Sequence, residues 1–280
     1  MAAMGGRLRL ATGIDVYYER DGDGEPALVF LHGGGGHCWH WQLQMPYFAR
    51  LTTVLVYDLR GHGRSDAPGG RYSIETFVDD LASLLDALRI ERPILVGHSL
   101  GGMIALRYAF DFPDRVSGIV VVDSGCEVLP QNREEWRQLV VARAQDYQAA
   151  QAMMSRYCSS PASGRAAFVA EALAATPETP RQVIDATHYG LLTFCNAAAA
   201  SFLTCPVLVI GAAEMDYWPS VRAWMEYVPH ARLVAVFRCG HYLMLEQPSD
   251  FNTALEQFLG DVRAGVAPSG EPRETPPGWV

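Results

Sequence analysis

The 280-residue sequence predicts an α/β fold, with a mostly parallel central sheet, flanking helices and an inserted helical cap. Short, almost continuously apolar runs recur along the chain, as in strands that are buried on both faces of a parallel sheet. Helical patterns separate several of these runs, which is the alternation typical of crossover connections. The runs are Ala27–Leu31, Thr53–Tyr57, Pro93–Gly97, Gly118–Val122, Pro206–Ile210 and Arg232–Val236.

The clearest helical pattern is Ser73–Leu88, where apolar residues recur at spacings of three and four behind a serine that can cap the first turn. A second helix is expected from near Pro248. Residues 126–204 interrupt the alternation, with helical composition and no convincing strand. Because ligands bind at the carboxyl ends of the strands in such sheets, we interpret this segment as a cap over the site.

The expected organisation is therefore a core of residues 1–125 and 205–265, a helical cap of 126–204, and a flexible C-terminal tail of 266–280 that is rich in Pro and Gly.

Composition and charge exclude several classes of function. The chain is 49% hydrophobic and 19% charged, as in ordinary folded proteins, and its net charge is −9 at pH 7. A nucleic acid or an anionic lipid surface would need clustered cations, so neither is an expected partner. No run approaches the roughly 20 apolar residues of a membrane helix, and no secretory signal is recognisable. We expect a cytoplasmic protein, monomeric or homodimeric.

The six cysteines are scattered, without CxxC pairs or a histidine cluster at ligand spacing. Reduced thiols are therefore expected, and neither a metal nor an organic cofactor is predicted.

The segment Gly97-His98-Ser99-Leu100-Gly101 follows an apolar run and precedes a helical pattern. In a sharp strand-to-helix turn, the central residue is strained, and only small residues two positions to either side leave room for it. Ser99 would project its hydroxyl at the edge of the sheet as a nucleophile, beside the positive end of the helix. The Leu100 N–H would donate to an oxyanion.

A run of glycines, Gly33–Gly36, comes directly after the first apolar run. Glycines there let backbone N–H groups approach a bound carbonyl, which would provide the second half of an oxyanion hole. We expect Gly33 and Gly34 to act there with Leu100, and the neighbouring His32 to support the loop.

Five motifs occur in the order seen in the α/β-hydrolase superfamily, which the sequence resembles over about residues 14–262. They are His32–Gly36, Asp58–Ser65, Gly97–Gly102, Pro113–Val116 and Gly240-His241. The resemblance implies the α/β-hydrolase fold and a serine nucleophile, followed along the chain by an acid and then a histidine. These motifs carry little information about the substrate.

A serine hydroxyl needs a base, and His241, which follows the last apolar run, is the best candidate among the eight histidines. A neutral imidazole in turn needs an acceptor for its other nitrogen. Glu214 is favoured because it lies three residues after Gly211 and 27 before His241, similar to the usual acid placement of the family. Asp216, on the same segment, and Asp123, at the end of the fourth run, remain alternatives.

Together these residues imply a hydrolase that forms an acyl-enzyme at Ser99. Aromatic residues are candidates for the walls of a substrate pocket and suit a small hydrophobic ester or lactone. Hydrolysis of a carbon–carbon bond, cofactor-free perhydrolysis, and a non-catalytic receptor on the same fold remain alternatives. The candidate pocket residues are Trp39, Trp136, Tyr189 and Trp218.

Overall fold

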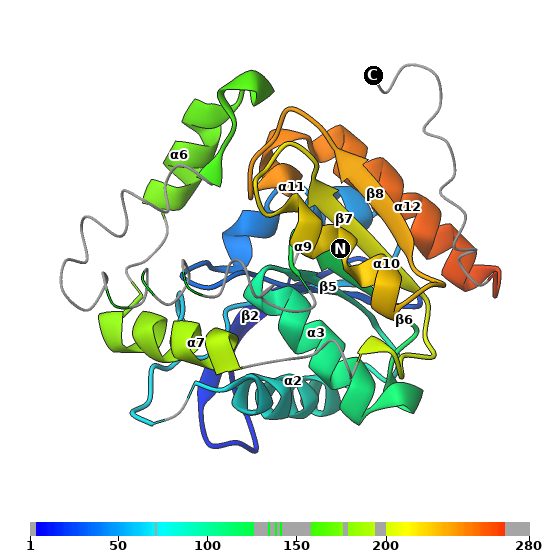
Figure 1. Cartoon of the computed structure of the whole chain (residues 1–280). Coiled ribbons are helices and arrows are strands. Elements are labelled where there is room, and N and C mark those ends of the chain that lie inside the picture. Colours follow the sequence, from blue (N-terminus) through cyan, green and yellow to red (C-terminus); the bar gives the residue numbers. More distant parts are fainter. Residues whose placement is uncertain are drawn as a thin grey trace.

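The structure is a computed structural model that describes residues 4–70, 72–125, 158–175, 179–193 and 200–266, together with positions 134, 138 and 141. For residues 188–193 only the backbone is described. An eight-stranded sheet runs through the middle of the molecule, with helices on both sides (Figure 1).

The strands cross the sheet in the order β1-β2-β4-β3-β5-β6-β7-β8. Strands β3 to β8 are all parallel, whereas β1 and β2 form an antiparallel hairpin that pairs with β4 at one edge. The predicted mostly parallel sheet is confirmed. The strands are β1 (Met4–Arg9), β2 (Asp15–Asp21), β3 (Leu28–Leu31), β4 (Val54–Tyr57), β5 (Ile94–His98), β6 (Gly118–Val122), β7 (Val207–Ala212) and β8 (Arg232–Val236).

The six predicted strands are β3 to β8, and their bounds differ from the predicted ones by at most two residues. The β1–β2 hairpin is not among the predicted strands. Most of its residues are exposed or half-buried, because a strand at the edge of a sheet is covered less completely than a central one. The continuous apolar runs that identify buried strands are therefore missing from this hairpin.

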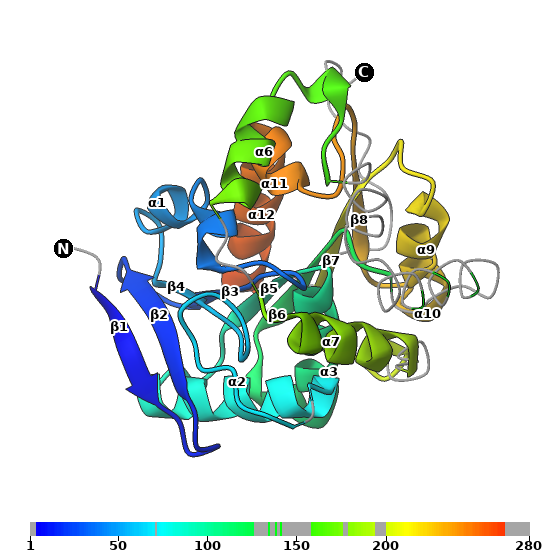
Figure 2. The same cartoon turned by 90° about the vertical axis from the view of Figure 1, so that its left-hand side faces the viewer.

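Two layers of helices enclose the sheet, and Figure 2 shows α2 and α3 on one side of it and α12 on the other. Successive strand residues point to opposite faces, so each face has its own core. Leu95 of β5 belongs to the core beneath α2 and α3, and Val96 belongs to the core beneath α12. The first layer contains α2 (Ile74–Leu88), α3 (Leu100–Asp111), α9 (Trp218–Arg222) and α10 (Trp224–Tyr227). The second contains the 3₁₀ helix η1 (Cys38–Trp41), α1 (Met45–Phe48), α11 (Leu243–Glu246) and α12 (Pro248–Arg263), while the short η2 (Pro113–Arg115) follows α3.

The helices expected at Ser73–Leu88, after the Ser99 turn and from Pro248 are present as α2, α3 and α12. The Ser73 side chain accepts a hydrogen bond from the Thr76 N–H at the start of α2, as its predicted capping role requires. Helix α12 begins at Pro248, whose missing N–H is tolerated at the first helical position. Within the described part of the chain, no helix combines the length and apolarity needed to cross a membrane.

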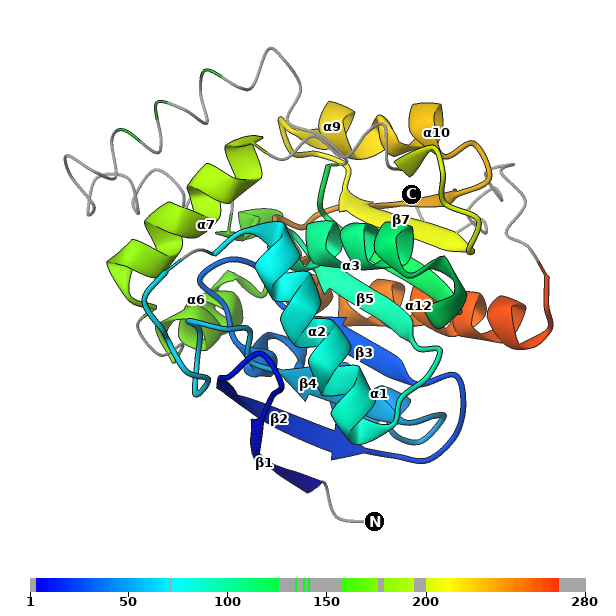
Figure 3. The same cartoon turned by 90° about the horizontal axis from the view of Figure 1, so that it is seen from below.

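Part of the predicted cap segment is described, as η3 (Pro161–Ser163), α6 (Ala166–Ala174) and α7 (Arg181–Thr193). Val169 of α6 packs into the core on the α12 side, and Val183 of α7 packs into the core on the α2 side. Figure 3 shows α6 and α7 beside the same end of the sheet. The division into core, cap and tail stays a prediction, because most of residues 126–157 and all of 267–280 lie outside the described residues.

The parallel direction of the strands gathers distant residues at one edge. Ser99 follows β5, Asp123 follows β6, and His241 lies in the segment after β8. Because β5, β6 and β8 run in the same direction, all three residues lie at the carboxyl edge of the sheet, where open α/β sheets place their sites.

Candidate active site

Ser99 occupies the turn between β5 and α3 with a backbone conformation (φ 51°, ψ −113°) that L-residues rarely adopt. Two glycines make this turn possible. A Cβ atom on Gly97 would lie 2.1 Å from the Gly101 carbonyl oxygen, and one on Gly101 would lie 2.3 Å from that of Leu31. Neither position therefore accepts a side chain, as the pattern around Ser99 predicts.

The turn leaves the first N–H of α3 available for a ligand. The backbone of Ser99 is held on both sides, since its N–H donates to the Val122 carbonyl at 3.0 Å and its own carbonyl accepts from the Gly102 N–H at 2.9 Å. Leu100 is the first residue of α3, so its N–H has no acceptor within the helix. This group lies where the sequence predicts an oxyanion donor.

The glycine loop lies directly beside this turn. A Cβ atom on Gly33 would come within 2.8 Å of His98 Nδ1 and 3.3 Å of Ser99 Cβ. His32 holds the loop, as expected: its Nε2 accepts from the Leu59 N–H at 3.0 Å, so its Nδ1 carries the proton and donates to the Gly33 carbonyl at 2.8 Å. Burial lowers the pKa of His32 well below its ordinary value, which keeps this tautomer neutral.

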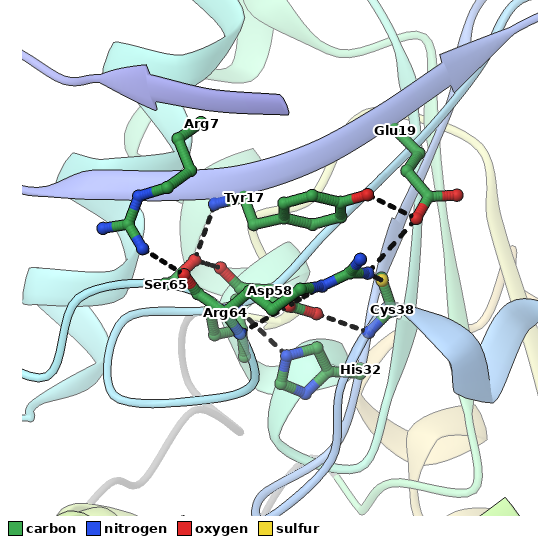
Figure 4. A network of polar contacts seen from close by, with 9 residues as sticks. Arg7, Tyr17, Glu19, His32, Cys38, Asp58, Arg64 and Ser65 are labelled. Carbon is green, nitrogen blue, oxygen red and sulfur yellow. Dashed lines mark hydrogen bonds and ion pairs between the residues drawn. The ribbon is translucent and has the colours of Figure 1, made fainter. Parts of the chain in front are cut away.

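Behind the glycine loop, a polar network centred on Asp58 anchors the loop that follows β4 (Figure 4). Asp58 Oδ1 accepts from the Cys38 N–H at 2.7 Å, and Oδ2 accepts from the Arg64 N–H at 2.8 Å. The Arg64 guanidinium lies over the ring of Tyr17, 3.3 Å from its centroid. The network ties η1 and the 58–65 motif to the N-terminal hairpin, so this motif has a structural place beside the site.

His37, Cys38 and Asp58 are the group of potential metal ligands among the described residues, with ligand atoms within 4.8 Å of one another. The protein's own cation already occupies this cluster. Arg64 Nη2 lies 3.2 Å from Cys38 Sγ, and its Nε lies 3.6 Å from Asp58 Oδ2. Burial also raises the pKa of the Cys38 thiol, whereas a metal ligand must be a thiolate. We therefore interpret the cluster as a structural ion pair.

His241 is paired with Asp123. Its Nδ1 lies 2.7 Å from Asp123 Oδ2, and the carboxylate side chain is completely buried. Because a carboxylate only accepts, Nδ1 carries a proton and the free Nε2 is left as the basic nitrogen. Within the described residues, the Ser99 hydroxyl forms no hydrogen bond with His241; such bonds are often long in ligand-free sites.

His98 fixes the His241 segment above the serine turn. His98 Nε2 lies 2.9 Å from the His241 carbonyl oxygen, and the two imidazole rings have centroids 4.4 Å apart. Burial, followed by the proximity of His241, lowers the pKa of His98 well below its ordinary value. A neutral His98 with its proton on Nε2 donates to this carbonyl, so the residue next to Ser99 positions the loop that carries His241.

The geometry corrects the preference for Glu214 as the acid. Glu214 is exposed, and its Oε2 accepts from the Arg238 N–H at 2.8 Å, which closes the loop after β8. Asp216 is also exposed and forms no contact with His241. Asp123 (φ 48°), which follows β6, instead directs its side chain to the imidazole. Of the three carboxylates considered, Asp123 is therefore the one that contacts His241.

Two further residues, Tyr217 and Glu246, support the site through contacts that the sequence does not predict. Tyr217 donates from its hydroxyl to Asp123 Oδ2 at 2.6 Å, and Asp123 Oδ1 accepts from the Ala212 N–H at 2.9 Å. The buried Glu246 accepts from the Gly240 N–H and from the Ser160 N–H, each at 2.7 Å. Glu246 thereby joins the residue before His241 to the segment that leads into α6.

The four candidate pocket residues differ in exposure and packing, and two of them cannot be described. Trp39 is 52% exposed and stacks on His37. Trp218 packs against β7 instead of facing an open space, because a Cβ atom on Gly211 would lie 2.8 Å from its ring. Trp136 and the side chain of Tyr189 lie outside the described residues.

The model of the alpha/beta hydrolase family matches residues 28–254. The chain belongs to this family, and it is an α/β-hydrolase. A curated relative, the 2-hydroxymuconate semialdehyde hydrolase of Pseudomonas sp. strain CF600, is 31% identical over 282 residues, covering 93% of this chain and 96% of the relative. The 3-oxoadipate enol-lactonase 2 of Acinetobacter baylyi is 28% identical over 244 residues, covering 84% of this chain and 88% of the relative.

Solved structures agree with this membership. A structure of an N-acyl homoserine lactone degrading enzyme superposes with a TM-score of 0.81 at 32% identity, covering 90% of this chain and all of that one. The enol-lactonase from Burkholderia xenovorans has a TM-score of 0.80 at 22% identity, with coverages of 91% and 100%, and is a likeness of fold.

The serine turn yields a test of its steric basis. Gly97→Ala places a methyl group against backbone atoms that cannot move away, and we expect it to lower the free energy of unfolding by at least ~3 kcal/mol or to prevent folding. Gly260→Ala is the matched control: it lies inside α12 with nothing within 4 Å of a new Cβ, and should stabilise by roughly 1 kcal/mol. Urea unfolding measures both, and equal effects would contradict the steric argument.

Proposed function

We propose that the protein hydrolyses a small hydrophobic carboxylic ester or lactone, with Ser99 as nucleophile, His241 as base and Asp123 as the acid. The observation that carries the proposal is the 2.7 Å contact of His241 Nδ1 with the buried Asp123 carboxylate, beside a serine held at a strained strand-to-helix turn. This constellation has the parts of a serine-hydrolase triad, in the chain order Ser, acid, His.

In the proposed reaction, Ser99 Oγ attacks the carbonyl carbon while His241 Nε2 accepts the hydroxyl proton. The Leu100 N–H and an N–H of Gly33 or Gly34 hold the oxyanion that forms. When the carbon–oxygen bond of the leaving group breaks, His241 returns the proton to the departing alkoxide. Asp123 accepts from Nδ1 throughout, which fixes the tautomer and stabilises the imidazolium.

The second half-reaction repeats the sequence with water. His241 takes a proton from water as its oxygen attacks the acyl-enzyme, and then gives the proton to Ser99 Oγ as the acid product leaves. With a lactone the alcohol stays attached to the acyl group, so the ring-opened hydroxy acid is the single product. The chemistry uses only groups of the chain, a carbonyl substrate and water.

The substrate class is supported by two of the relatives. One bears the name of an enol-lactonase, and a solved structure at 32% identity is that of a lactone-degrading enzyme. The exposed ring of Trp39, on the 3₁₀ helix η1 that follows the glycine loop, offers an apolar surface. We therefore rank ester and lactone hydrolysis first.

One observation favours a second candidate, the hydrolysis of a carbon–carbon bond. The relative at 31% identity is named for a semialdehyde substrate, which contains no ester linkage. The same serine, histidine and oxyanion donors can serve a ketone carbonyl, so the substrate decides between the two candidates.

An activity screen tests the substrate class together with the nucleophile. We expect aryl esters or aliphatic lactones to be turned over faster than diketone acids, and Ser99→Ala to reduce kcat by at least about 10⁴-fold, because the covalent route is lost. A fluorophosphonate probe should label the wild type and not Ser99→Ala. A folded protein that binds ligand but resists labelling and cleaves none of these substrates would be a receptor on a hydrolase fold, contrary to the proposal.

The acid is tested by a matched pair of amide variants. Asp123→Asn should lower kcat by roughly 10⁴-fold, since an amide can donate to His241 and stabilise the wrong tautomer. Glu214→Gln should keep kcat near the wild-type value, because Glu214 contacts a backbone N–H and not the imidazole. Steady-state kinetics of both variants, with thermal unfolding as the check on folding, would overturn the assignment if the two effects were reversed.

A further inference from the structure

Tyr217 contacts the same carboxylate oxygen as His241. Its hydroxyl donates to Asp123 Oδ2 at 2.6 Å, while His241 Nδ1 lies 2.7 Å from that oxygen. The hydroxyl is also only 3.5 Å from Nδ1, and the two rings stand nearly perpendicular at 84°. The three groups therefore form one compact cluster, in which the phenol and the imidazole share an acceptor.

The Tyr217 hydroxyl is positioned by the loop after β7, which packs closely on that strand. Helix α9 begins at Trp218, directly after Tyr217, and lies against β7 where Gly211 provides no side chain. The Trp218 N–H donates to the Met215 carbonyl at 2.9 Å, which turns the chain so that Tyr217 faces the end of β6. The sequence favours this loop, with Glu214, as the source of the acid. In the structure the loop instead supplies the Tyr217 hydroxyl, which donates to Asp123 after β6.

The three donors on Asp123 have separate effects. The Ala212 N–H holds Oδ1, so the carboxylate plane is fixed at one end by the backbone of β7. At the other end, Tyr217 holds Oδ2 in the position that His241 uses. A donor on a carboxylate oxygen also withdraws charge from it, which weakens the attraction of that oxygen for an imidazolium proton.

We propose that Tyr217 is a positioning residue of the site: its hydroxyl locks the Asp123 carboxylate in line with His241 and moderates the charge that the imidazole faces. This inference rests on the proposed function, in which His241 acts as the base. The Tyr217 hydroxyl lies on the Nδ1 side of His241, away from Nε2, and its effect on turnover passes through Asp123.

The proposal predicts two changes in Tyr217→Phe, which keeps the ring and removes the donor. The carboxylate loses one of its three donors and is held less firmly in line with His241, so kcat should fall about 10-fold while KM stays unchanged, a loss typical of one hydrogen bond to a charged group. The carboxylate that remains carries more of its charge toward His241, so the acid limb of the kcat/KM profile should move to higher pH.

The other titratable groups around the pair are the same in wild type and variant. Among the described residues they are His98 on β5, Cys239 in the segment after β8, Tyr242, whose ring packs edge-on against His241, and Glu246 on α11, which lies near enough to Asp123 to feel its charge. A shift of the acid limb in Tyr217→Phe therefore reports on the removed hydroxyl. Tyr108→Phe is the matched control, because it removes a buried hydroxyl of α3 that has no hydrogen-bond partner among the described residues and should leave kcat unchanged.

The deciding experiment is a double-mutant cycle on the ester that the screen identifies, with Tyr217→Phe made in the wild type and in Asp123→Asn. If Tyr217 acts through the carboxylate, the 10-fold loss should nearly disappear in the Asn background. An equal loss in both backgrounds, or a wild-type rate and pH profile in Tyr217→Phe alone, overturns the inference. Wild-type activity in Ser99→Ala and Asp123→Asn would instead sink the proposed function, so the two failures are distinguishable.

Discussion

The backbone strain at Ser99 is the constraint on which the rest of the site depends. A non-glycine residue with φ near 51° is strained, and the conformation persists only where the surrounding structure enforces it. Here Gly97 and Gly101 allow the chain to pack closely against itself at the turn. The strain is held by the sheet: the Ser99 N–H donates to the Val122 carbonyl, and Asp123, the residue that follows β6, donates its N–H to the carbonyl of Ile210 in β7 at 2.7 Å. One backbone ladder thus sets the register of the serine, the carboxylate and the loop that carries Tyr217.

The position of the carboxylate follows from this ladder. Asp123 has a positive φ as well, so the chain leaves β6 with its side chain turned toward His241 and away from solvent. A carboxylate that is fully buried must be satisfied by hydrogen bonds, and Asp123 receives them from a backbone N–H, a phenol and an imidazole. The loop after β7 does not supply the acid, but its Tyr217 hydroxyl is one of these donors. His98 and Glu246 hold the His241 segment through its backbone, at the His241 carbonyl and the Gly240 N–H.

The buried parts of the fold could be predicted from the sequence, because continuous apolar runs and the helical spacing behind Ser73 depend on local patterns. The serine turn and His241 could be placed for the same reason, since each is tied to the end of a strand. The edge hairpin β1–β2 could not be predicted in this way, because most of its residues are exposed or half-buried and form no continuous apolar run. The acid could not be chosen, because Asp123 and Glu214 both follow strands in the right chain order. The tertiary contacts separate them: Asp123 reaches His241, whereas Glu214 accepts from the Arg238 N–H.

We propose that the strained serine, the Asp123–His241 pair and the two backbone oxyanion donors form one acyl-transfer centre. A crystal structure of the protein after inactivation by an aryl phosphonate ester tests it most directly, because the adduct resembles the tetrahedral intermediate. We expect phosphorus to be bonded to Ser99 Oγ, a phosphonyl oxygen to lie within hydrogen-bond distance of the Leu100 N–H and of the Gly33 or Gly34 N–H, and His241 to remain paired with Asp123. An adduct on another residue, or His241 turned to Glu214, would contradict it.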